Sequence, residues 1–554
     1  MYCNRMLYKF SFCNYIINKT LGGELIMGIY FNPSNASFRQ ARNSMVYVDK
    51  TNLLNFLNRR LFTDDKCIAL SHARRFGKSH AAGMIDAYYS LGCDSTKLFE
   101  DTKLASNADY KKHMNKYNVI HLDISSFWDD FKDNIIKKIQ EYILDEFKKE
   151  FKNKIDFTKK FNVVLMSIYD ITNIPFVIII DEWDCIIRNS HDENLIHKYL
   201  QFLHSLFKSE ESKSFLALAY ITGILPIKKI KDESALNNFR EYTMLKSKPI
   251  TEYYGFTEDE VKNLCKQYDM DFDSTKAWYN GYLIDGMHMY NPNSVSMAMD
   301  RQDFDSYWKN TSSFASINTF ITMNYAGLKD DIMAMLAGGI VRVNTNTFKN
   351  DFSTIASKDD ALTALIHLGY LGYDSDRKKA FIPNYEVATA FEAALQTGEW
   401  SDIARAISTC DELLDETIEW NAERVAELIE LAHDTYTSVL KYNDENSLSC
   451  VLTMAYFTAP AYYNIIREMP AGKGFADFAF IPRANAGHRP AMIVELKYNQ
   501  SADTALLQIK ANRYHGALAD YSDRILLVGI NYDSEGKDKK HHSCTIAEYV
   551  KPSI

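Results

Sequence analysis

The chain has 554 residues, 46% of them hydrophobic and 24% charged, so it is long enough for several globular domains of about 100–200 residues each. Its nine cysteines show no CxxC spacing and no apolar run approaches the ~20 residues of a membrane helix, which argues against a disulfide framework, a zinc site and a membrane partner and favours a cytoplasmic protein. The net charge of −9 argues weakly against a nucleic-acid partner, but the acidic excess lies in residues 401–445, with 12 acidic and 3 basic residues, whereas residues 446–554 hold 10 and 12.

Residues 1–26 show neither a structural pattern nor a secretory signal. An orderly pattern begins at Met27, and the segment Gly22–Glu24 could be encoded by a purine-rich tract of the kind that binds ribosomes. We therefore expect translation to start at Met27 and residues 1–26 to be a non-structural extension.

A phosphate-binding loop is predicted after a short apolar strand over residues 66–70, because the next loop ends in Gly77, Lys78 and Ser79. Such a loop surrounds a phosphate with backbone N–H groups, and the helix that follows directs its positive end at the same phosphate. Lys78 would neutralise the β and γ phosphates of ATP, and Ser79 would bind Mg²⁺. The full motif has a glycine where this chain has His72, so a basic loop before a helix is the alternative.

A continuous apolar run over residues 174–180 is typical of a parallel strand that is buried on both faces. The run ends in Asp181, which would hold Mg²⁺, and Glu182, which would polarise the attacking water. The next predicted strand ends at Thr222, a candidate sensor of the γ-phosphate. The alternatives are a solvated acidic turn for the carboxylates and a plain strand cap for the threonine.

A further strand over residues 119–123 and an amphipathic helix over residues 131–154 complete an alternation of strands and helices. This order predicts an α/β fold built on a sheet.

Seven segments of the chain resemble a family of bacterial AAA-ATPase-like proteins that are often fused to a nuclease domain. They are YVDKT (47–51), ARRFGKS (73–79), IIIDEWD (178–184), YITGILPI (220–227), GFTEDEV (255–261), WYNGY (278–282) and YNPNSV (290–295). The resemblance implies an AAA-like P-loop core with a parallel sheet over residues 27–250 and a family habit of lacking the first P-loop glycine. Arg75, with Arg74, is a candidate for phosphate contact or for an arginine finger acting in trans, although both could simply form a basic surface. A homo-oligomer is left open.

The region 251–400 is predicted to hold a helical lid and a winged-helix-like unit. Thr257 and Glu260 have the spacing of a capping box, which predicts a helix that starts at Thr257. From Asp359 the pattern predicts a helix, a short strand, a turn and a second strand; such a unit packs on an ATPase core more often than it binds DNA. Residues 401–445 are then expected to form an acidic helical spacer.

Two strands are predicted near the C-terminus, over residues 474–481 and 491–497. Glu495 and Lys497 lie two residues apart and so face the same side of the strand, and pairing as a hairpin would bring Asp477 close to them. Hard Mg²⁺ prefers oxygen ligands, which two carboxylates supply, and an ammonium group beside them can orient a nucleophile or stabilise developing charge. The alternative is an exposed hairpin with an incidental salt bridge.

The pattern D-x17-E-x-K resembles the PD-(D/E)XK nuclease superfamily, and two flanking signals strengthen the resemblance. Gln508 lies on a predicted helix over residues 502–513 and is followed by Tyr514, and Glu445 precedes an apolar helix over residues 448–457. The resemblance implies a restriction-endonuclease-like α/β domain over residues 446–554. It further implies that Asp477, Glu495, Lys497 and Gln508 are catalytic and that Glu445, Asp477 and Glu495 bind metal.

Together these features predict an ATP-binding protein whose Mg²⁺-dependent nuclease domain cleaves DNA or RNA, with DNA favoured. One alternative is a nucleotide-switched signalling or scaffold protein whose C-terminal domain binds without cutting. Another is an ATPase with a purely regulatory winged helix.

Overall fold

The computed structural model describes residues 28–227, 236–307, 325–336, 338–350, 352–397, 409–437, 445–471, 474–483, 488–518, 524–536 and 540–550, together with residues 317, 319, 320, 323 and 522. The expected translation start at Met27 and the extension before it lie outside these residues. The chain forms two compact units. Unit 1 comprises residues 1–268, 281–301 and 343–378, and unit 2 comprises residues 269–280, 302–342 and 379–554. The domain boundaries drawn from the sequence stay a prediction.

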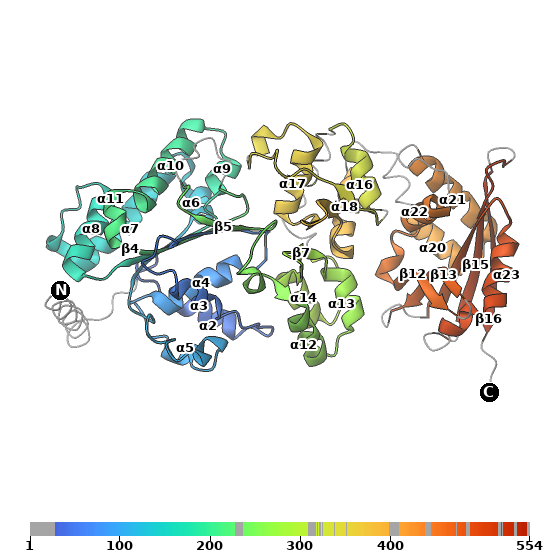
Figure 1. The fold of residues 1–554 in the computed structure, drawn as a ribbon, viewed down its shortest axis with the longest axis horizontal. Coiled ribbons are helices and arrows are strands. Elements are labelled where there is room, and N and C mark those ends of the chain that lie inside the picture. The colour runs from blue at the N-terminus through green and yellow to red at the C-terminus, as the bar shows by residue number, and fades with distance from the viewer. Residues whose placement is uncertain are drawn as a thin grey trace. The chain divides into compact units, whose positions relative to one another are not determined.

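Unit 1 is built on a five-stranded parallel sheet in the order β2–β3–β4–β1–β5 (Figure 1). Its strands are β1 (Cys67–Ser71), β2 (Asn118–Asp123), β3 (Phe176–Asp181), β4 (Leu216–Gly223) and β5 (Arg240–Thr243). Because parallel neighbours end at the same edge, the carboxyl ends of β1, β3 and β4 lie together, and the predicted phosphate-binding residues lie at this edge. The strands expected from the apolar runs are confirmed to within two residues.

Helices cover both faces of this sheet (Figure 1). One face packs against α7 (Ile135–Phe151), α8 (Phe161–Thr172) and α10 (Glu193–Phe207), and the other packs against α3 (Leu53–Asn58) and α4 (Lys78–Tyr89). Neighbouring residues of β3 enter opposite cores, which explains why the run reads as continuously apolar. The remaining helices of this part are α2 (Ala36–Arg42), α5 (Thr96–Phe99), α6 (Ile124–Phe131), α9 (Cys185–Asn189) and α11 (Glu210–Phe215).

Beyond the parallel sheet, unit 1 contains α12 (Glu258–Tyr268) and α14 (Pro292–Arg301). The capping box is confirmed, since the Thr257 backbone N–H donates to the Glu260 carboxylate over 2.9 Å. A small antiparallel sheet in the order β6–β8–β7 lies beside these helices, and the polar composition did not predict it. Its strands are β6 (Phe256–Thr257), β7 (Tyr282–Ile284) and β8 (Met287–Tyr290).

The predicted succession from residue 359 is confirmed as α17 (Lys358–Leu368), β10 (Gly372–Asp374) and β11 (Lys379–Phe381). The other helices and short strands that lie between β5 and β12 in the sequence are α13 (Phe272–Tyr279), α16 (Leu328–Leu336), β9 (Val341–Arg342), α18 (Tyr385–Thr397), α20 (Cys410–Ile418), α21 (Ala422–Thr437) and α22 (Glu445–Ala455). Single 3-10 turns are η1 (Lys103–Ser106), η2 (Lys132–Asn134), η3 (Lys152–Lys154), η4 (Thr251–Tyr253), η5 (Phe352–Thr354), η6 (Ala459–Ala461) and η7 (Tyr514–Leu518).

The large sheet of unit 2 is mixed and has the order β12–β13–β14–β15–β16. Its strands are β12 (Tyr463–Ala471), β13 (Gly474–Pro482), β14 (Ala491–Tyr498), β15 (Arg524–Tyr532) and β16 (His542–Val550). Only β14 and β15 are parallel neighbours, and α23 (Ala502–Asn512) connects them. Helix α23 covers one face, and α20, α21 and α22 cover the other (Figure 1). The predicted α/β fold class therefore holds for both sheets.

No helix among the described residues is both long and apolar enough to cross a membrane.

Candidate active sites

The P-loop residues lie where β1 gives way to α4. Gly77 is the N-cap of α4 with φ of 84°, a left-handed conformation that glycine adopts without steric penalty. Lys78 is buried, which lowers its pKa, and its Nζ donates to the carbonyl oxygens of His72 (3.0 Å) and Ala73 (2.9 Å). Ser79 and Arg75 are exposed. The ammonium group and the helix N-terminus therefore share one loop, as phosphate binding requires.

His72, which replaces the first glycine of the P-loop motif, is completely buried. Its Nε2 lies 2.9 Å from the Ser247 hydroxyl oxygen, and its ring packs against that of Tyr254. Burial lowers the pKa of His72 to about 3, so the imidazole is neutral at physiological pH. This loop is thus held by a buried side chain where the ordinary motif has only backbone.

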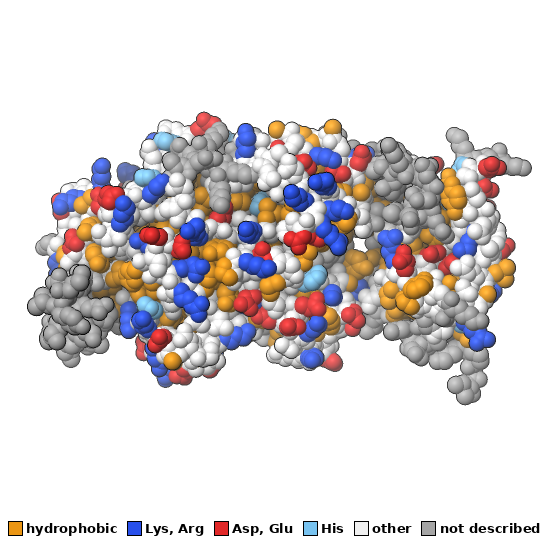
Figure 2. Space-filling model, in the orientation of Figure 1, with side chains coloured by type: hydrophobic (Ala, Val, Ile, Leu, Met, Phe, Trp, Pro, Cys, Tyr) orange, Lys and Arg blue, Asp and Glu red, His pale blue; other side chains and the backbone are white. Residues whose placement is uncertain are grey.

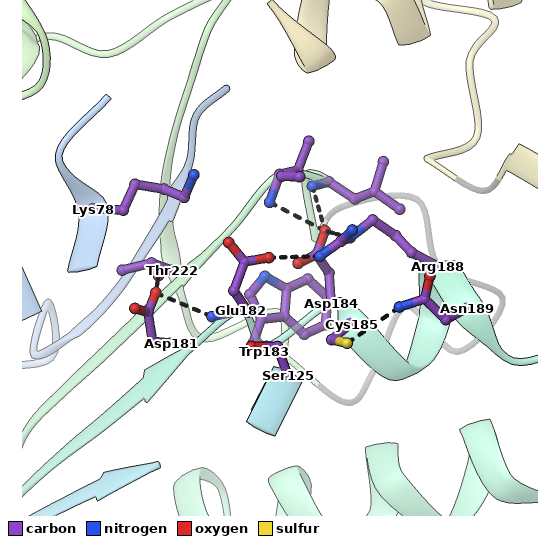
Figure 3. Close-up of polar contacts among 12 residues, drawn as sticks. Lys78, Ser125, Asp181, Glu182, Trp183, Asp184, Cys185, Arg188, Asn189 and Thr222 are labelled. Atoms are coloured by element: carbon purple, nitrogen blue, oxygen red, sulfur yellow. Dashed lines mark hydrogen bonds and ion pairs between the residues drawn. The ribbon is translucent and has the colours of Figure 1, made fainter. Parts of the chain in front are cut away.

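The carboxylates at the end of β3 meet the end of β4 at the same edge of the sheet (Figure 3). The Thr222 hydroxyl donates to Asp181 Oδ1, and both residues are buried. Glu182 has φ of 51° and donates its backbone N–H to the same oxygen over 3.1 Å. Burial raises the pKa of Glu182, and the positive charge of Lys78 opposes this shift. Lys78, Asp181, Glu182 and Thr222 are therefore gathered as the sequence predicted.

Two charged residues of this edge were missed by the sequence reasoning. Arg188 Nη2 donates to Glu182 Oε2 over 2.6 Å, and its Nε donates to Asp184 Oδ2 over 2.9 Å (Figure 3). Asp184 is the N-cap of α9, and Arg188 follows four residues later on that helix. The i,i+4 spacing of opposite charges was a usable signal.

In the second unit, Asp477 on β13 approaches the end of β14. Its Oδ2 accepts the backbone N–H of Leu496 over 2.7 Å. Lys497 Nζ lies 3.1 Å from Glu495 Oε1 and also donates to the Leu496 carbonyl oxygen. From α23, the Gln508 amide donates to the same Glu495 oxygen. The structure thus brings together the four residues that the D-x17-E-x-K pattern and its flanking helix indicated.

Glu495 is only 2% exposed, and its Oε2 has no hydrogen-bond partner among the described residues. Burial, followed by the nearby charge of Asp477, raises the pKa of Glu495 to about 7. A buried carboxylate oxygen without a donor, beside a second carboxylate, suits a hard divalent cation. Among the described residues no group of three or more His, Cys, Asp or Glu side chains has the arrangement of a metal site, and the side chain of Glu445 lies outside them. The proposed metal set therefore rests on Asp477 and Glu495.

A second polar cluster of unit 2 was not predicted. Glu430 on α21 accepts from His542 Nδ1 over 2.9 Å, and His542 Nε2 lies 3.0 Å from His433 Nδ1. The residues are up to 112 positions apart, so no local pattern reveals the contact.

Two family models match separate parts of the chain. The model described as "Predicted AAA-ATPase" matches residues 35–231, and the model of the PD-(D/E)XK nuclease superfamily matches residues 443–542. The first match contains Lys78, Asp181, Glu182 and Thr222, and the second contains Asp477, Glu495, Lys497 and Gln508.

A curated relative is an uncharacterized protein in the vnfD 5′ region of Azotobacter chroococcum mcd 1, which is 26% identical over 141 residues. The match covers 25% of this chain and 27% of the relative, so the chain spans about a quarter of that protein's length.

Two solved structures are similar over 65% of this chain. They are the ORC2 protein of Aeropyrum pernix in ADPNP–ADP complexes, with 96% of that chain covered, 11% identity and a TM-score of 0.31, and Cdc6p of Pyrobaculum aerophilum, with 97% covered, 9% identity and a TM-score of 0.24. Both overlaps are too loose to carry a functional comparison.

Proposed function

Because the chain joins an AAA-ATPase-like domain to a domain of the PD-(D/E)XK nuclease superfamily, we propose that it binds and hydrolyses ATP and that its C-terminal site cleaves phosphodiester bonds of nucleic acid with the help of Mg²⁺. DNA is the favoured substrate, with RNA as the other outcome of the test. ATP binding or hydrolysis gates the cleavage.

One observation carries the nuclease part of the proposal. Asp477, Glu495 and Lys497 converge at the end of a hairpin, and Glu495 keeps a buried oxygen that no described residue satisfies. An incidental surface salt bridge would be solvated, whereas Glu495 and Lys497 are both nearly buried. A buried carboxylate with a second carboxylate and an ammonium group nearby is expected at a site for a cation and a phosphate.

In this proposal Asp477 and Glu495 hold the cation, and Lys497 orients the attacking water or stabilises the charge that builds on the phosphate. Gln508 keeps Glu495 in place by donating to Oε1, the oxygen that also lies against Lys497. A bound Mg²⁺ would supply a water of lowered pKa and offset charge on the phosphate.

The ATPase part assigns each group a separate task. Lys78 and the amides at the start of α4 hold the β and γ phosphates, with Arg75 as a further contact. Ser79 and Asp181 hold the Mg²⁺ that accompanies ATP, Thr222 senses the γ-phosphate, and Glu182 polarises the attacking water.

A nucleic-acid partner is also compatible with the surface of the middle region. Figure 2 shows Lys and Arg side chains gathered around α17 on the face that it draws. Arg377 and Lys378 are exposed in the turn between β10 and β11, where a winged unit presents its wing. Exposed cations contact the phosphate backbone without sequence preference.

The deciding experiment incubates single- and double-stranded DNA and RNA with wild-type protein, Mg²⁺ or Mn²⁺, and either ATP or no nucleotide. Lys497→Ala is expected to abolish cleavage and to leave ATP binding unchanged. Lys78→Ala is expected to remove ATP binding and any stimulation by ATP. Intact substrates under all conditions with wild-type protein would reject the nuclease function.

A second candidate is a nucleotide-switched scaffold whose C-terminal domain binds nucleic acid or protein without cutting. The observation in its favour is that the described residues offer two carboxylates for a metal and no third ligand. The test is Mn²⁺ binding, measured by calorimetry on wild type and on Glu495→Gln. Equal Mn²⁺ affinity for both proteins would favour the scaffold over the nuclease.

A further inference from the structure

Glu182, the proposed polarising base of ATP hydrolysis, is held by an arginine of its own domain. Its Oε2 accepts a 2.6 Å hydrogen bond from Arg188 Nη2. A hydrogen bond between a guanidinium and a carboxylate is roughly twice as strong as one between neutral groups. The Arg188 side chain is only 8% exposed, so water screens this ion pair poorly. One oxygen of the Glu182 carboxylate is thus occupied by the Arg188 guanidinium.

Arg188 is itself fixed in place by a second carboxylate. Its Nε donates to Asp184 Oδ2 over 2.9 Å, and Asp184 is completely buried. The planar guanidinium therefore bridges Asp184 and Glu182 with two of its nitrogens (Figure 3). Neither Asp184 nor Glu182 is an exposed side chain that rotates freely in solvent.

Asp184 connects this bridge to the end of β4. Its Oδ2 also accepts the backbone N–H groups of Ile224 (3.1 Å) and Leu225 (2.8 Å), which directly follow the strand. Gly223 permits this approach, because a Cβ there would lie 2.6 Å from Asp184 Oδ1. Thr222, the proposed sensor of the γ-phosphate, is the residue before Gly223. The amides that hold Asp184 therefore lie two and three residues after Thr222 in the chain.

We propose that Arg188 is a positioning residue that restrains Glu182, and that contact of Thr222 with the γ-phosphate releases the restraint through the amides of Ile224 and Leu225 and through Asp184. This inference rests on the proposed ATPase function. Restraint of the base keeps turnover slow until the end of β4 moves. Removal of Arg188 then frees Glu182 for water without altering the groups that hold the phosphates.

The test compares ATP turnover and ATP affinity of wild-type protein and Arg188→Gln. The substitution is expected to raise kcat by at least about threefold, because a freed carboxylate is the more effective general base. KM and the Kd of a fluorescent ATP analogue are expected to stay within about twofold of wild type, because Arg188 donates to carboxylates and not to the P-loop. The gain is expected to vanish in the double variant Arg188→Gln/Glu182→Gln.

Arg240→Gln is the matched control. It removes an arginine that pairs with Asp65 on the surface of the same domain, and turnover is expected to equal that of wild type. Equal or slower turnover of Arg188→Gln beside a normally active wild type would overturn the inference and leave the ATPase function standing. A wild-type protein that binds no ATP analogue would defeat the proposed function, and the restraint would fall with it.

Arg188→Lys tests the proposal if Arg188→Gln does not fold. A lysine keeps the positive charge but is a point donor that cannot bridge both carboxylates in one plane. Its turnover is expected to lie above that of wild type. Turnover at or below the wild-type value would contradict the proposal.

Discussion

At the scale of single residues, Gly529 decides how closely α23 approaches the sheet beside the candidate nuclease site. It pairs with Glu495 across the parallel strands β14 and β15. A Cβ at this position would lie 2.2 Å from the Ala502 carbonyl oxygen and 3.0 Å from the Leu506 backbone nitrogen. Both are backbone atoms of the helix region, so no side-chain rotation relieves the clash.

We therefore expect Gly529→Ala to lower the free energy of unfolding by about 1–3 kcal/mol, in the range of other overpacked sites. Displacement of α23 would also carry Gln508 away from Glu495 and reduce nuclease activity. Urea unfolding and the cleavage assay measure the two effects. Gly516→Ala is the control, because a Cβ there meets no atom within 4 Å. Equal stability of the two variants would show that α23 can shift without loss.

His72 makes a second prediction at this scale. Its buried ring packs on Tyr254 and bonds Ser247, so His72→Ala leaves a cavity and an unpaired hydroxyl. We expect a loss of about 2–4 kcal/mol in the free energy of unfolding, together with weaker ATP binding. Denaturant unfolding and titration with a fluorescent ATP analogue provide the measurements. His80→Ala, two residues into α4 and exposed, is expected to change stability by less than about 0.5 kcal/mol. If His72→Ala is as stable as wild type, then His72 only fills a space that the loop can close without it.

At the scale of elements, α21 contacts β16 through polar side chains. His433 and Glu430 on the helix both lie within hydrogen-bonding distance of His542 on the strand. Burial, followed by the charge of His542, lowers the pKa of His433 from 6.5 to about 4. Partial burial alone would raise the pKa of Glu430, but its hydrogen bonds and charge interaction with His542 lower that pKa to about 2. Both shifts mean that the unfolded chain binds more protons than the folded one as the pH falls.

Between pH 6.5 and 4.5 the unfolded His433 is protonated and the folded one is neutral, so stability falls with falling pH in this window. The full effect is at most about 3 kcal/mol for a shift of this size. We expect His433→Gln, which cannot titrate, to flatten the decline between pH 6.5 and 4.5. Below pH 4.5 both proteins should lose stability through Glu430. Parallel stability curves for wild type and variant across the upper window would contradict the assignment.

The elements also show how far sequence reasoning reaches. Strand β3 was predictable because burial on both faces leaves a continuous apolar run. Strand β14 was predictable because Glu495 and Lys497 alternate with apolar residues. The hairpin of β7 and β8 was missed because its strands are three and four residues long in a polar region. Its Asp285–Gly286 turn, with φ of 52° and 81°, was a usable signal.

The candidate sites also contain contacts that could be predicted from the sequence and contacts that could not. Asp477, Glu495, Lys497 and Gln508 were predictable because the residues at two strand ends and one helix face are set by short spacings. The hydrogen bonds from the amides after β4 to Asp184 were not predictable, because they depend on which parallel strands are neighbours. The contact of Glu430 with His542 joins residues 112 positions apart, and only the folded sheet brings them together.

At the scale of the whole molecule, the proposed function requires that the nucleotide site and the nuclease site be coupled thermodynamically. Coupling between two binding sites is reciprocal: a nucleotide that changes the affinity for DNA by a given factor must itself be bound with an affinity changed by the same factor when DNA is present. This reciprocity holds whatever route the coupling takes through the chain. It can be measured on Lys497→Ala, which is expected to bind DNA without cutting it.

We expect a slowly hydrolysed ATP analogue to tighten DNA binding by Lys497→Ala about fivefold or more, because gating by ATP requires that the nucleotide-bound form favour the substrate. Fluorescence anisotropy of a labelled oligonucleotide gives one factor, and titration of a fluorescent nucleotide with and without DNA gives the other. The two factors must agree within error. The double variant Lys78→Ala/Lys497→Ala, which lacks the P-loop cation, should bind DNA equally with and without the analogue. A DNA affinity of Lys497→Ala that ignores the nucleotide would show that the two sites act independently, and gating by ATP would then be lost even if each domain is active.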